Sequence, residues 1–135
     1  MFEITIKPRF CETDARGHIN NTVLPVWFEQ GRTEVFLDNN PPHGMPYWPV
    51  MIARIEIDYL EQTFYRPETR VRSGVEKIST RSFIFYQQIW QGEKMVARAR
   101  SVMVYLDMQT QRSTPIPDDV RPALVALLIS PDAIL

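Results

Sequence analysis

Hydrophobic and polar residues alternate along much of the chain, which is the pattern of half-buried β-strands. The alternation is clear at Phe2–Ile6, and it returns from Met51, where Ile55, Ile57 and Tyr59 point to one side. Three further strands are predicted at Thr69–Ile78, Ser82–Trp90 and Lys94–Leu106. Because the connections between these later strands are short, we expect neighbouring strands to run antiparallel.

Between the first two strands the hydrophobic period lengthens to that of a helix. One helical stripe is formed by Leu24, Trp27, Phe28, Gly31 and Val35. The stripe predicts a helix at about Thr22–Leu37, capped by Asn21 or Thr22 and stopped by the sequence Asn39-Asn40-Pro41-Pro42. Gly31 weakens a helix by ~1 kcal/mol relative to alanine, so we expect close approach to a sheet there.

A shorter helix is predicted at Val120–Ile129, with Asp118 or Asp119 as its cap. The order is then strand, helix, four strands and short helix. One long helix against one antiparallel sheet is an α+β arrangement. The length of 135 residues suits a single domain, residues 1–135. A sheet with an exposed edge or a second wet face often pairs with a copy of itself, so we expect self-association.

Composition narrows the possible classes of protein. Fifteen basic and sixteen acidic residues are spread along the chain, which argues against nucleic acid as a partner. The start lacks a signal-peptide pattern and no apolar run reaches the ~20 residues that span a bilayer, so we expect a soluble protein without a membrane partner. Cys11 is the single cysteine and suits a reducing compartment, the cytoplasm, where we expect it to be a packing residue. Together with His18 and His43 it offers too few ligands for a zinc site, and we expect neither metal nor cofactor.

The segment at residues 9–21 concentrates the side chains that can carry chemistry. It contains Glu12, Asp14, His18, Asn20 and Asn21, directly before the long helix. A helix N-terminus stabilises negative charge that develops on a carbonyl oxygen. A nearby carboxylate can attack an acyl carbon or deprotonate a water that does so. The segment therefore suits acyl transfer, with the apolar helix side over the sheet as a groove for the acyl chain.

Taken singly, the same residues have structural interpretations. Asp14, followed by Ala-Arg-Gly, predicts an Asx turn, and Gly17 predicts a tight turn or a positive φ. His18 suits a loop residue bonded to backbone, and the two asparagines are ordinary turn and cap residues. Glu29 suits a solvated helix carboxylate that pairs with Arg32 or Thr33. Individually, then, they leave the function open.

As a group they resemble a known family. The string D-x-x-G-H-I-N-N at residues 14–21 and F-E-x-x-R at residues 28–32 are similar to motifs of the hotdog-fold acyl-CoA thioesterases, which include 4-hydroxybenzoyl-CoA thioesterase. The resemblance continues through Ala53–Tyr59, Arg81–Phe83, Val96–Ala99 and Pro115–Pro117. It implies a hotdog fold, a five-stranded antiparallel sheet wrapped around one long central helix. It also implies homodimers or homotetramers with active sites at the subunit interface.

The resemblance implies hydrolysis of an acyl-CoA substrate to free acid and CoA. Asp14 matches the catalytic carboxylate, His18 the motif histidine, and Asn20 and Asn21 the amides that begin the helix. Glu29 is expected to contribute from the same or the neighbouring subunit. Substrate-binding candidates are Gly17, Ser79, Arg81 and Ser82. A loop arginine suits CoA phosphates, although Arg81 equally suits a solvated hairpin.

Two departures from the family pattern bear on substrate choice and on helper residues. Leu24 stands where a tyrosine is common, and Arg16 where Met, Leu or Asn is usual. Two other functions stay open: a hotdog module that binds acyl-CoA without hydrolysis, and a hotdog hydratase or dehydratase. The presence of both Asp14 and His18 disfavours a module that only binds. The position of these two residues relative to the long helix disfavours a hydratase or dehydratase. The loop Met45–Pro49 either shapes the acyl pocket or covers the core.

Overall fold

The computed structural model describes residues 1–134 and confirms the predicted order of elements. The main elements are β1 (Phe2–Ile6), α1 (Leu24–Asp38), β2 (Val50–Tyr59), β3 (Thr69–Ile78), β4 (Ser82–Gln91), β5 (Lys94–Asp107), β6 (Arg112–Ser113) and α2 (Arg121–Val125). Short 3-10 helices lie at Phe10–Glu12, Pro42–Gly44 and Pro131–Ala133. The two-residue strand β6 is an addition to the prediction.

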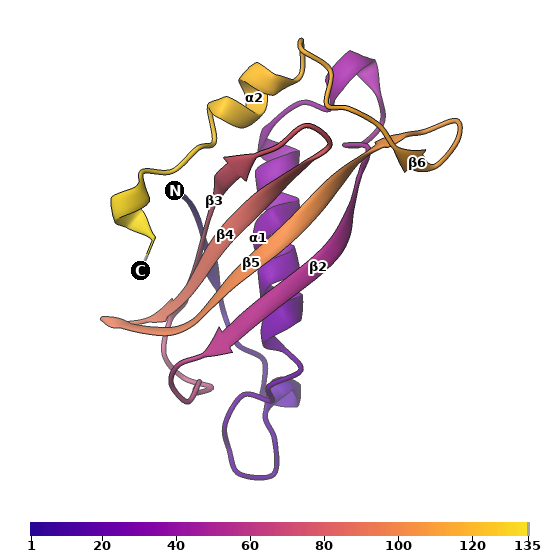
Figure 1. Cartoon of the computed structure of the whole chain (residues 1–135). Coiled ribbons are helices and arrows are strands. Elements are labelled where there is room, and N and C mark those ends of the chain that lie inside the picture. The colour runs from indigo at the N-terminus through magenta and orange to yellow at the C-terminus, as the bar shows by residue number, and fades with distance from the viewer. Residues whose placement is uncertain (135) are drawn as a thin grey trace.

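The strands form one curled antiparallel sheet in the order β1-β3-β4-β5-β2, and β6 pairs with β5. The long helix α1 lies across one face of this sheet, as Figure 1 shows. The α+β class is confirmed, as are the five-stranded sheet and central helix of a hotdog fold.

The helix packs closely on the sheet through its hydrophobic stripe. Trp27, Phe28 and Val35 are buried in the core. A Cβ added to Gly31 would lie 2.8 Å from a methyl group of Val71 and 2.8 Å from Nε2 of Gln87. These distances are too short for any side chain, and they confirm the close approach that the glycine predicted.

The start of α1 differs from the prediction by two residues. Val23 is the N-cap and its side chain makes no capping hydrogen bond, so the predicted cap at Asn21 or Thr22 is wrong. The side-chain oxygen of Asn20 instead accepts from the backbone N–H and the hydroxyl of Thr22, at 2.9 and 2.8 Å. This turn delays the helix, and Pro25 is tolerated in the first turn because its missing N–H has no intrahelical partner there.

The second helix is shorter than predicted, and its cap is also different. After α2 the chain turns back, and Val75 of β3 exchanges backbone hydrogen bonds with Leu127 and Ile129, both at 2.9 Å. Val120 is the N-cap, again without a side-chain bond. Asp119 is 2.7 Å from Nε2 of His43, so it pairs with the loop after α1 rather than capping α2.

Strand β2 forms one edge of the sheet, and none of its ten residues is buried. Of the three residues predicted to share one apolar side, only Ile57 packs partly against the core, whereas Ile55 and Tyr59 are exposed. Met51, Ile52, Ile55 and Tyr59 are exposed. The edge is therefore long and rich in exposed apolar side chains.

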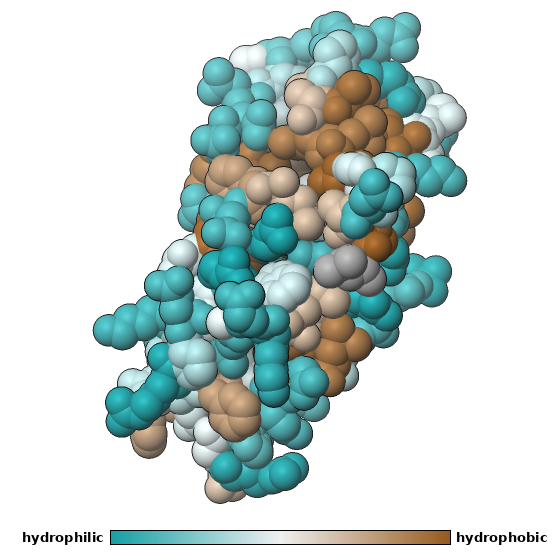
Figure 2. All heavy atoms as spheres, turned by 90° about the vertical axis from the view of Figure 1, so that its left-hand side faces the viewer, coloured by the Kyte–Doolittle hydropathy of each residue, from teal (hydrophilic) through white to brown (hydrophobic). Residues whose placement is uncertain are grey.

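The surface around the chain ends has a hydrophobic part and a hydrophilic part. Hydrophobic side chains gather in the upper part of this side of the molecule, whereas the lower part is mostly hydrophilic, as Figure 2 shows. Within residues 1–134, no helix has the length and apolar character needed to cross a membrane.

Candidate active site

Asp14 lies in a tight loop that precedes α1. The backbone N–H of Asp14 donates to the carbonyl of His18 at 2.7 Å, and the N–H of Gly17 donates to the carbonyl of Asp14 at 3.2 Å. Gly17 has a φ of 81°, which confirms the predicted positive φ. Thr13 and Ile19 pair antiparallel at the base of this loop. The motif residues 14–18 are thus folded onto one another.

The two oxygens of the Asp14 carboxylate have different surroundings. Oδ1 accepts from the backbone N–H of Arg16 at 2.8 Å and of His18 at 3.1 Å, which confirms the predicted Asx turn. Oδ2 has no hydrogen-bond partner within residues 1–134. The hydrogen bond from Arg16, with a smaller effect of the one from His18, lowers the pKa of Asp14 below its ordinary value of 3.8. The carboxylate is therefore ionised near neutral pH, with one oxygen fixed and the other free.

Side chains from two elements fix the loop beside α1. Glu12 is only 7% exposed, and its carboxylate accepts from the indole N–H of Trp27 at 3.1 Å and from the backbone N–H of Arg9 at 2.7 Å. The Tyr59 hydroxyl, at the end of β2, donates to the carbonyl of Asn21 at 2.8 Å. Burial raises the pKa of Tyr59, so this donor keeps its proton. The helix, the loop and the sheet edge are joined at one place.

His18 packs against an aromatic ring rather than against Asp14. Its ring meets that of Phe64 edge-on, with centroids 5.2 Å apart. Nδ1 of His18 is buried and has no hydrogen-bond partner within the described part of the chain. A buried polar atom without a partner costs about 1–3 kcal/mol, so Nδ1 is available to a group that enters the site.

Asn20 and Asn21 lie directly before α1, as predicted. The side-chain oxygen of Asn20 is used in the turn before the helix, and Asn21 is exposed. The helix has 15 residues, so its first turn carries a partial positive charge. Pro25 contributes no N–H to that turn. Catalytic roles for the two asparagines stay predictions.

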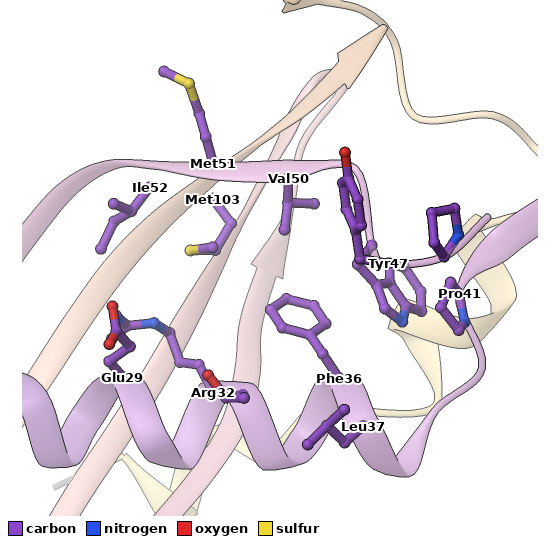
Figure 3. Close-up of a pocket in the computed structure, with 13 residues that line it drawn as sticks. Glu29, Arg32, Phe36, Leu37, Pro41, Tyr47, Val50, Met51, Ile52 and Met103 are labelled. Carbon is purple, nitrogen blue, oxygen red and sulfur yellow. The ribbon is translucent and has the colours of Figure 1, made fainter. Parts of the chain in front are cut away.

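Glu29 lies farther along α1, at one end of a groove between α1 and β2. The groove has a volume of about 470 Å³ and is also lined by Arg32, as Figure 3 shows. Asp14 is not among the residues that line it. Glu29 comes five residues after the first residue of α1, which places it roughly 8 Å along the helix axis. Its catalytic role stays a prediction.

Arg32 is a buried cation with neutral partners. It is 7% exposed, and its Nη1 donates to Oε1 of Gln87 and to the hydroxyl of Ser101, both at 3.2 Å. Burial lowers the pKa of Arg32, and the charge of Glu29 opposes this effect. Within residues 1–134 no ion pair within 4.0 Å joins Arg32 to Glu29, so the pairing suggested from the sequence is absent.

The remaining substrate-binding candidates lie at the other end of the molecule. Ser79 and Ser82 close the β3–β4 hairpin through a backbone hydrogen bond of 2.7 Å. Arg81 donates from Nη1 to the carbonyl of Ser113 in β6 at 2.9 Å. In Figure 1 this hairpin is near α2, whereas the loop before α1 is at the opposite end. One chain does not bring these three residues to Asp14.

Sequence reasoning missed some residues of the site and misjudged another. Arg32 follows Phe28 by four residues, so the helical stripe already placed it toward the sheet. Nothing in the sequence indicated the contacts of Glu12 and Phe64. Glu12 bonds to Trp27 and Phe64 packs on His18, and both pairs are so far apart along the chain that only the fold brings them together. Cys11 is exposed, so the predicted packing role is wrong. No cluster of three potential metal-ligating side chains occurs among residues 1–134.

The sequence and the structure of this chain are similar to those of several known proteins. The family model for the thioesterase-like superfamily matches residues 8–124. A curated relative is the uncharacterized protein YsmA of Bacillus subtilis (strain 168), which is 25% identical over 122 residues, covering 89% of this chain and 82% of the relative.

Two solved structures are similar over nearly their whole length. A predicted thioesterase from Bacillus stearothermophilus is 42% identical with a TM-score of 0.87, covering 96% of this chain and 98% of the other. A thioesterase from Thermus thermophilus, solved with coenzyme A and Zn, is 25% identical with a TM-score of 0.83, covering 93% of this chain and 92% of the other.

Proposed function

This chain belongs to the thioesterase-like superfamily, and from that membership we propose that it hydrolyses an acyl-CoA thioester to the free acid and CoA. The observation that carries the proposal is the Asp14 carboxylate. It is ionised, its Oδ1 is fixed by two backbone N–H groups and its Oδ2 is free, in the loop that leads into α1. A water-activating or attacking oxygen needs this combination of charge and fixed position.

In the proposed reaction the thioester carbonyl lies over the N-terminus of α1. As a general base, Oδ2 of Asp14 takes a proton from water while the water oxygen bonds to the acyl carbon. The tetrahedral intermediate then expels the CoA thiolate as the C–S bond breaks. As a nucleophile, Oδ2 would instead bond to the acyl carbon, and the C–S bond would break to release the CoA thiolate and leave a mixed anhydride. Water would then cleave this anhydride, which releases the free acid and restores the Asp14 carboxylate. Both routes develop negative charge on the carbonyl oxygen, which the helix end stabilises.

His18 is proposed to orient the substrate in either route. Its buried Nδ1 has no partner in residues 1–134, and in the tautomer that carries a proton there it can donate to the carbonyl oxygen. The contact with Phe64 fixes the plane of the ring. A thiolate is a good leaving group, so the reaction needs no strong acid for it.

CoA is the proposed carrier of the acyl group. The complex of the Thermus thermophilus thioesterase with coenzyme A supports this choice. Arg81 and its neighbours Ser79 and Ser82 lie far from Asp14 in one chain, so a contribution to the CoA phosphates would come from another protomer. We propose a homodimer that pairs through the uncovered edge strand β2, in which such a contribution is possible.

The proposal is tested by a thiol-release assay with acyl-CoAs of several lengths, on wild type and Asp14→Asn. Asparagine keeps an oxygen for the N–H groups of Arg16 and His18, so the loop is retained while the charge is lost. We expect kcat/KM to fall by about 10²–10⁴-fold. The matched control is Asp107→Asn, because Oδ1 of Asp107 accepts from the N–H groups of Gln109 and Thr110 in a similar turn.

The outcomes separate the alternatives. Full activity in Asp14→Asn would remove Asp14 from the mechanism and leave hydrolysis in place. Wild type that binds acyl-CoA but releases no thiol would identify a binding module. A comparable loss in Asp107→Asn would show that the effect comes from the turn rather than from the carboxylate.

A further inference from the structure

Asp14 lies at the tip of a short hairpin that residues 12–20 form before α1. At the base of the hairpin the backbone N–H of Asn20 donates to the carbonyl of Glu12 at 2.8 Å. Nearer the tip the backbone N–H of Asp14 donates to the carbonyl of His18 at 2.7 Å. Because these bonds join the two sides of the hairpin, a contact that fixes its base also fixes the carboxylate of Asp14.

Two hydrogen bonds from this hairpin reach different parts of the fold. The backbone N–H of Ile19 donates to the carbonyl of Thr63, in the segment before β3, at 2.8 Å. The carboxylate of Glu12 accepts from the indole N–H of Trp27 in α1 at 3.1 Å. Within residues 1–134 the second bond is the one hydrogen bond that joins the hairpin to α1. It therefore sets the orientation of the hairpin relative to the helix.

The carboxylate of Glu12 is buried, and each of its oxygens has a donor. Glu12 is 7% exposed and Trp27 is 2% exposed. Oε1 of Glu12 accepts from the backbone N–H of Arg9 at 2.7 Å, whereas Oε2 accepts from the indole. The guanidinium of Arg9 is 3.5 Å from Oε2 and is mostly exposed. A buried charge is tolerated only where donors surround it, so the two N–H groups fix both oxygens and the direction of the bond to α1.

We propose that Glu12 and Trp27 are positioning residues of the proposed thioesterase, whose hydrogen bond fixes Oδ2 of Asp14 relative to the N-terminus of α1. The inference rests on the proposed function. Trp27 is three residues after Leu24, the first residue of α1, so the bond is made to the first turn. In the proposed reaction the carboxylate acts on the acyl carbon and the helix end on the oxygen of the same carbonyl. Their relative position therefore determines the rate.

The first test removes each end of this hydrogen bond separately. Trp27→Phe removes the indole N–H and keeps an aromatic ring. Glu12→Gln keeps the size of the side chain, but its single oxygen cannot accept from both Arg9 and Trp27. With the acyl-CoA that wild type hydrolyses best, we expect kcat to fall by ~10–100-fold in each variant. KM should stay within about threefold of wild type, because substrate binding is retained.

The double variant tests whether Glu12 and Trp27 act through one bond. A shared bond is lost only once, so kcat of Glu12→Gln/Trp27→Phe should be within about threefold of the lower single variant. Effects that multiply would show that the two residues act independently, and they would overturn the proposal.

Two control variants separate positioning from a general loss of stability. Trp90→Phe removes the indole N–H that donates to Oε1 of Gln88 in β4 at 2.9 Å. Val35→Ala opens space beneath the second half of α1, where Val35 is buried. Both controls should keep kcat within about twofold of wild type, even where Tm falls as far as in Trp27→Phe. A loss of kcat in Val35→Ala that equals the loss in Trp27→Phe would overturn the positioning role.

Hydrogen exchange followed by NMR tests the same bond without a substrate. If opening of this bond releases the hairpin, the indole hydrogen of Trp27 and the amide hydrogen of Asp14 in wild type should have protection factors within about tenfold of each other. Glu12→Gln should speed exchange of the Asp14 amide by about tenfold or more. An indole that stays protected while the Asp14 amide exchanges freely would overturn the proposal, and this measurement needs no variant.

The outcomes distinguish this inference from the proposed function. If wild type hydrolyses no acyl-CoA, the proposed function fails, and hydrogen exchange alone decides whether the bond fixes the hairpin. If wild type is active and both single variants keep kcat within about twofold, the positioning role fails and the proposed function stands. A raised KM with unchanged kcat would also overturn it, since Glu12 and Trp27 would then affect binding instead. If Trp27→Phe does not unfold cooperatively, Glu12→Gln and the wild-type exchange decide.

Discussion

At the scale of single residues, Asp14 satisfies two interpretations at once. The sequence predicted an Asx turn from its neighbours and a catalytic carboxylate from the motif, and the turn is confirmed. The same hydrogen bonds that make the turn fix Oδ1 and leave Oδ2 free. A turn residue and a catalytic residue are therefore compatible here. Which oxygen is free could not be predicted, because it depends on how residues 14–18 close on themselves.

The pH dependence of hydrolysis follows from the lowered pKa of Asp14. A carboxylate with a lowered pKa stays ionised as the pH falls and is protonated only below its ordinary value of 3.8. We therefore expect this group to cause less than about a twofold loss of kcat/KM between pH ~7 and pH ~5. The profile should be measured with thermal unfolding at each pH. An acid limb with a midpoint between about 5 and 6 in a folded protein would contradict the assignment of this limb to Asp14.

At the scale of elements, the hydrophobic period located α1 and the strands, while their ends escaped prediction. The end of α2 is set by Val75, whose hydrogen bonds to Leu127 and Ile129 join segments about fifty residues apart. The start of α1 is set by the turn at Asn20, which competes with Asn21 and Thr22 as caps. Periodicity reports which face of an element is buried, and it contains no information about these competing bonds.

Gly31 offers a stability test of the contact between α1 and the sheet. Alanine there would gain ~1 kcal/mol of helix propensity but would force atoms of Val71, Ser73 and Gln87 to move. Overpacking of this kind costs about 1–3 kcal/mol, so we expect Gly31→Ala to lower Tm by several degrees in thermal unfolding. The matched control is Thr33→Ala on the exposed side of the same helix, which should leave Tm unchanged or raised. An increase of Tm in Gly31→Ala would mean that the sheet accommodates the methyl group.

At the scale of the whole molecule, the site candidates divide between two ends of the fold. The motif at residues 14–21 and the hairpin at residues 79–82 were grouped as one site from the sequence, yet one chain places them far apart. A sequence orders residues along the chain and does not say which ends of which elements meet. The strand β2 was predicted, but none of its ten residues is buried, so its side chains do not alternate between buried and exposed as expected. Within residues 1–134 this edge strand pairs with β5 on one side only, and the unpaired side is what suggests a second copy.

The proposed dimer can be tested at this edge. Ile55 is 37% exposed on β2, and Ile55→Lys would place a like charge on both copies where they approach. We expect sedimentation at micromolar concentration to shift from dimer toward monomer, with thermal unfolding of the monomer still cooperative. Val125→Lys is the control, because Val125 is 54% exposed in α2, away from β2. A monomeric wild type, or a dimer unaffected by Ile55→Lys, would contradict pairing through β2.

The exposed Cys11 makes the loop before α1 open to spectroscopy without any change of sequence. It is the single cysteine of the chain, so a thiol-reactive fluorophore would attach at one position. That position is three residues before Asp14 and directly beside Glu12, whose bond to Trp27 joins the loop to α1. A dye there would report movement or dehydration of the loop while a ligand binds. Arrival of the substrate could then be timed separately from the release of thiol.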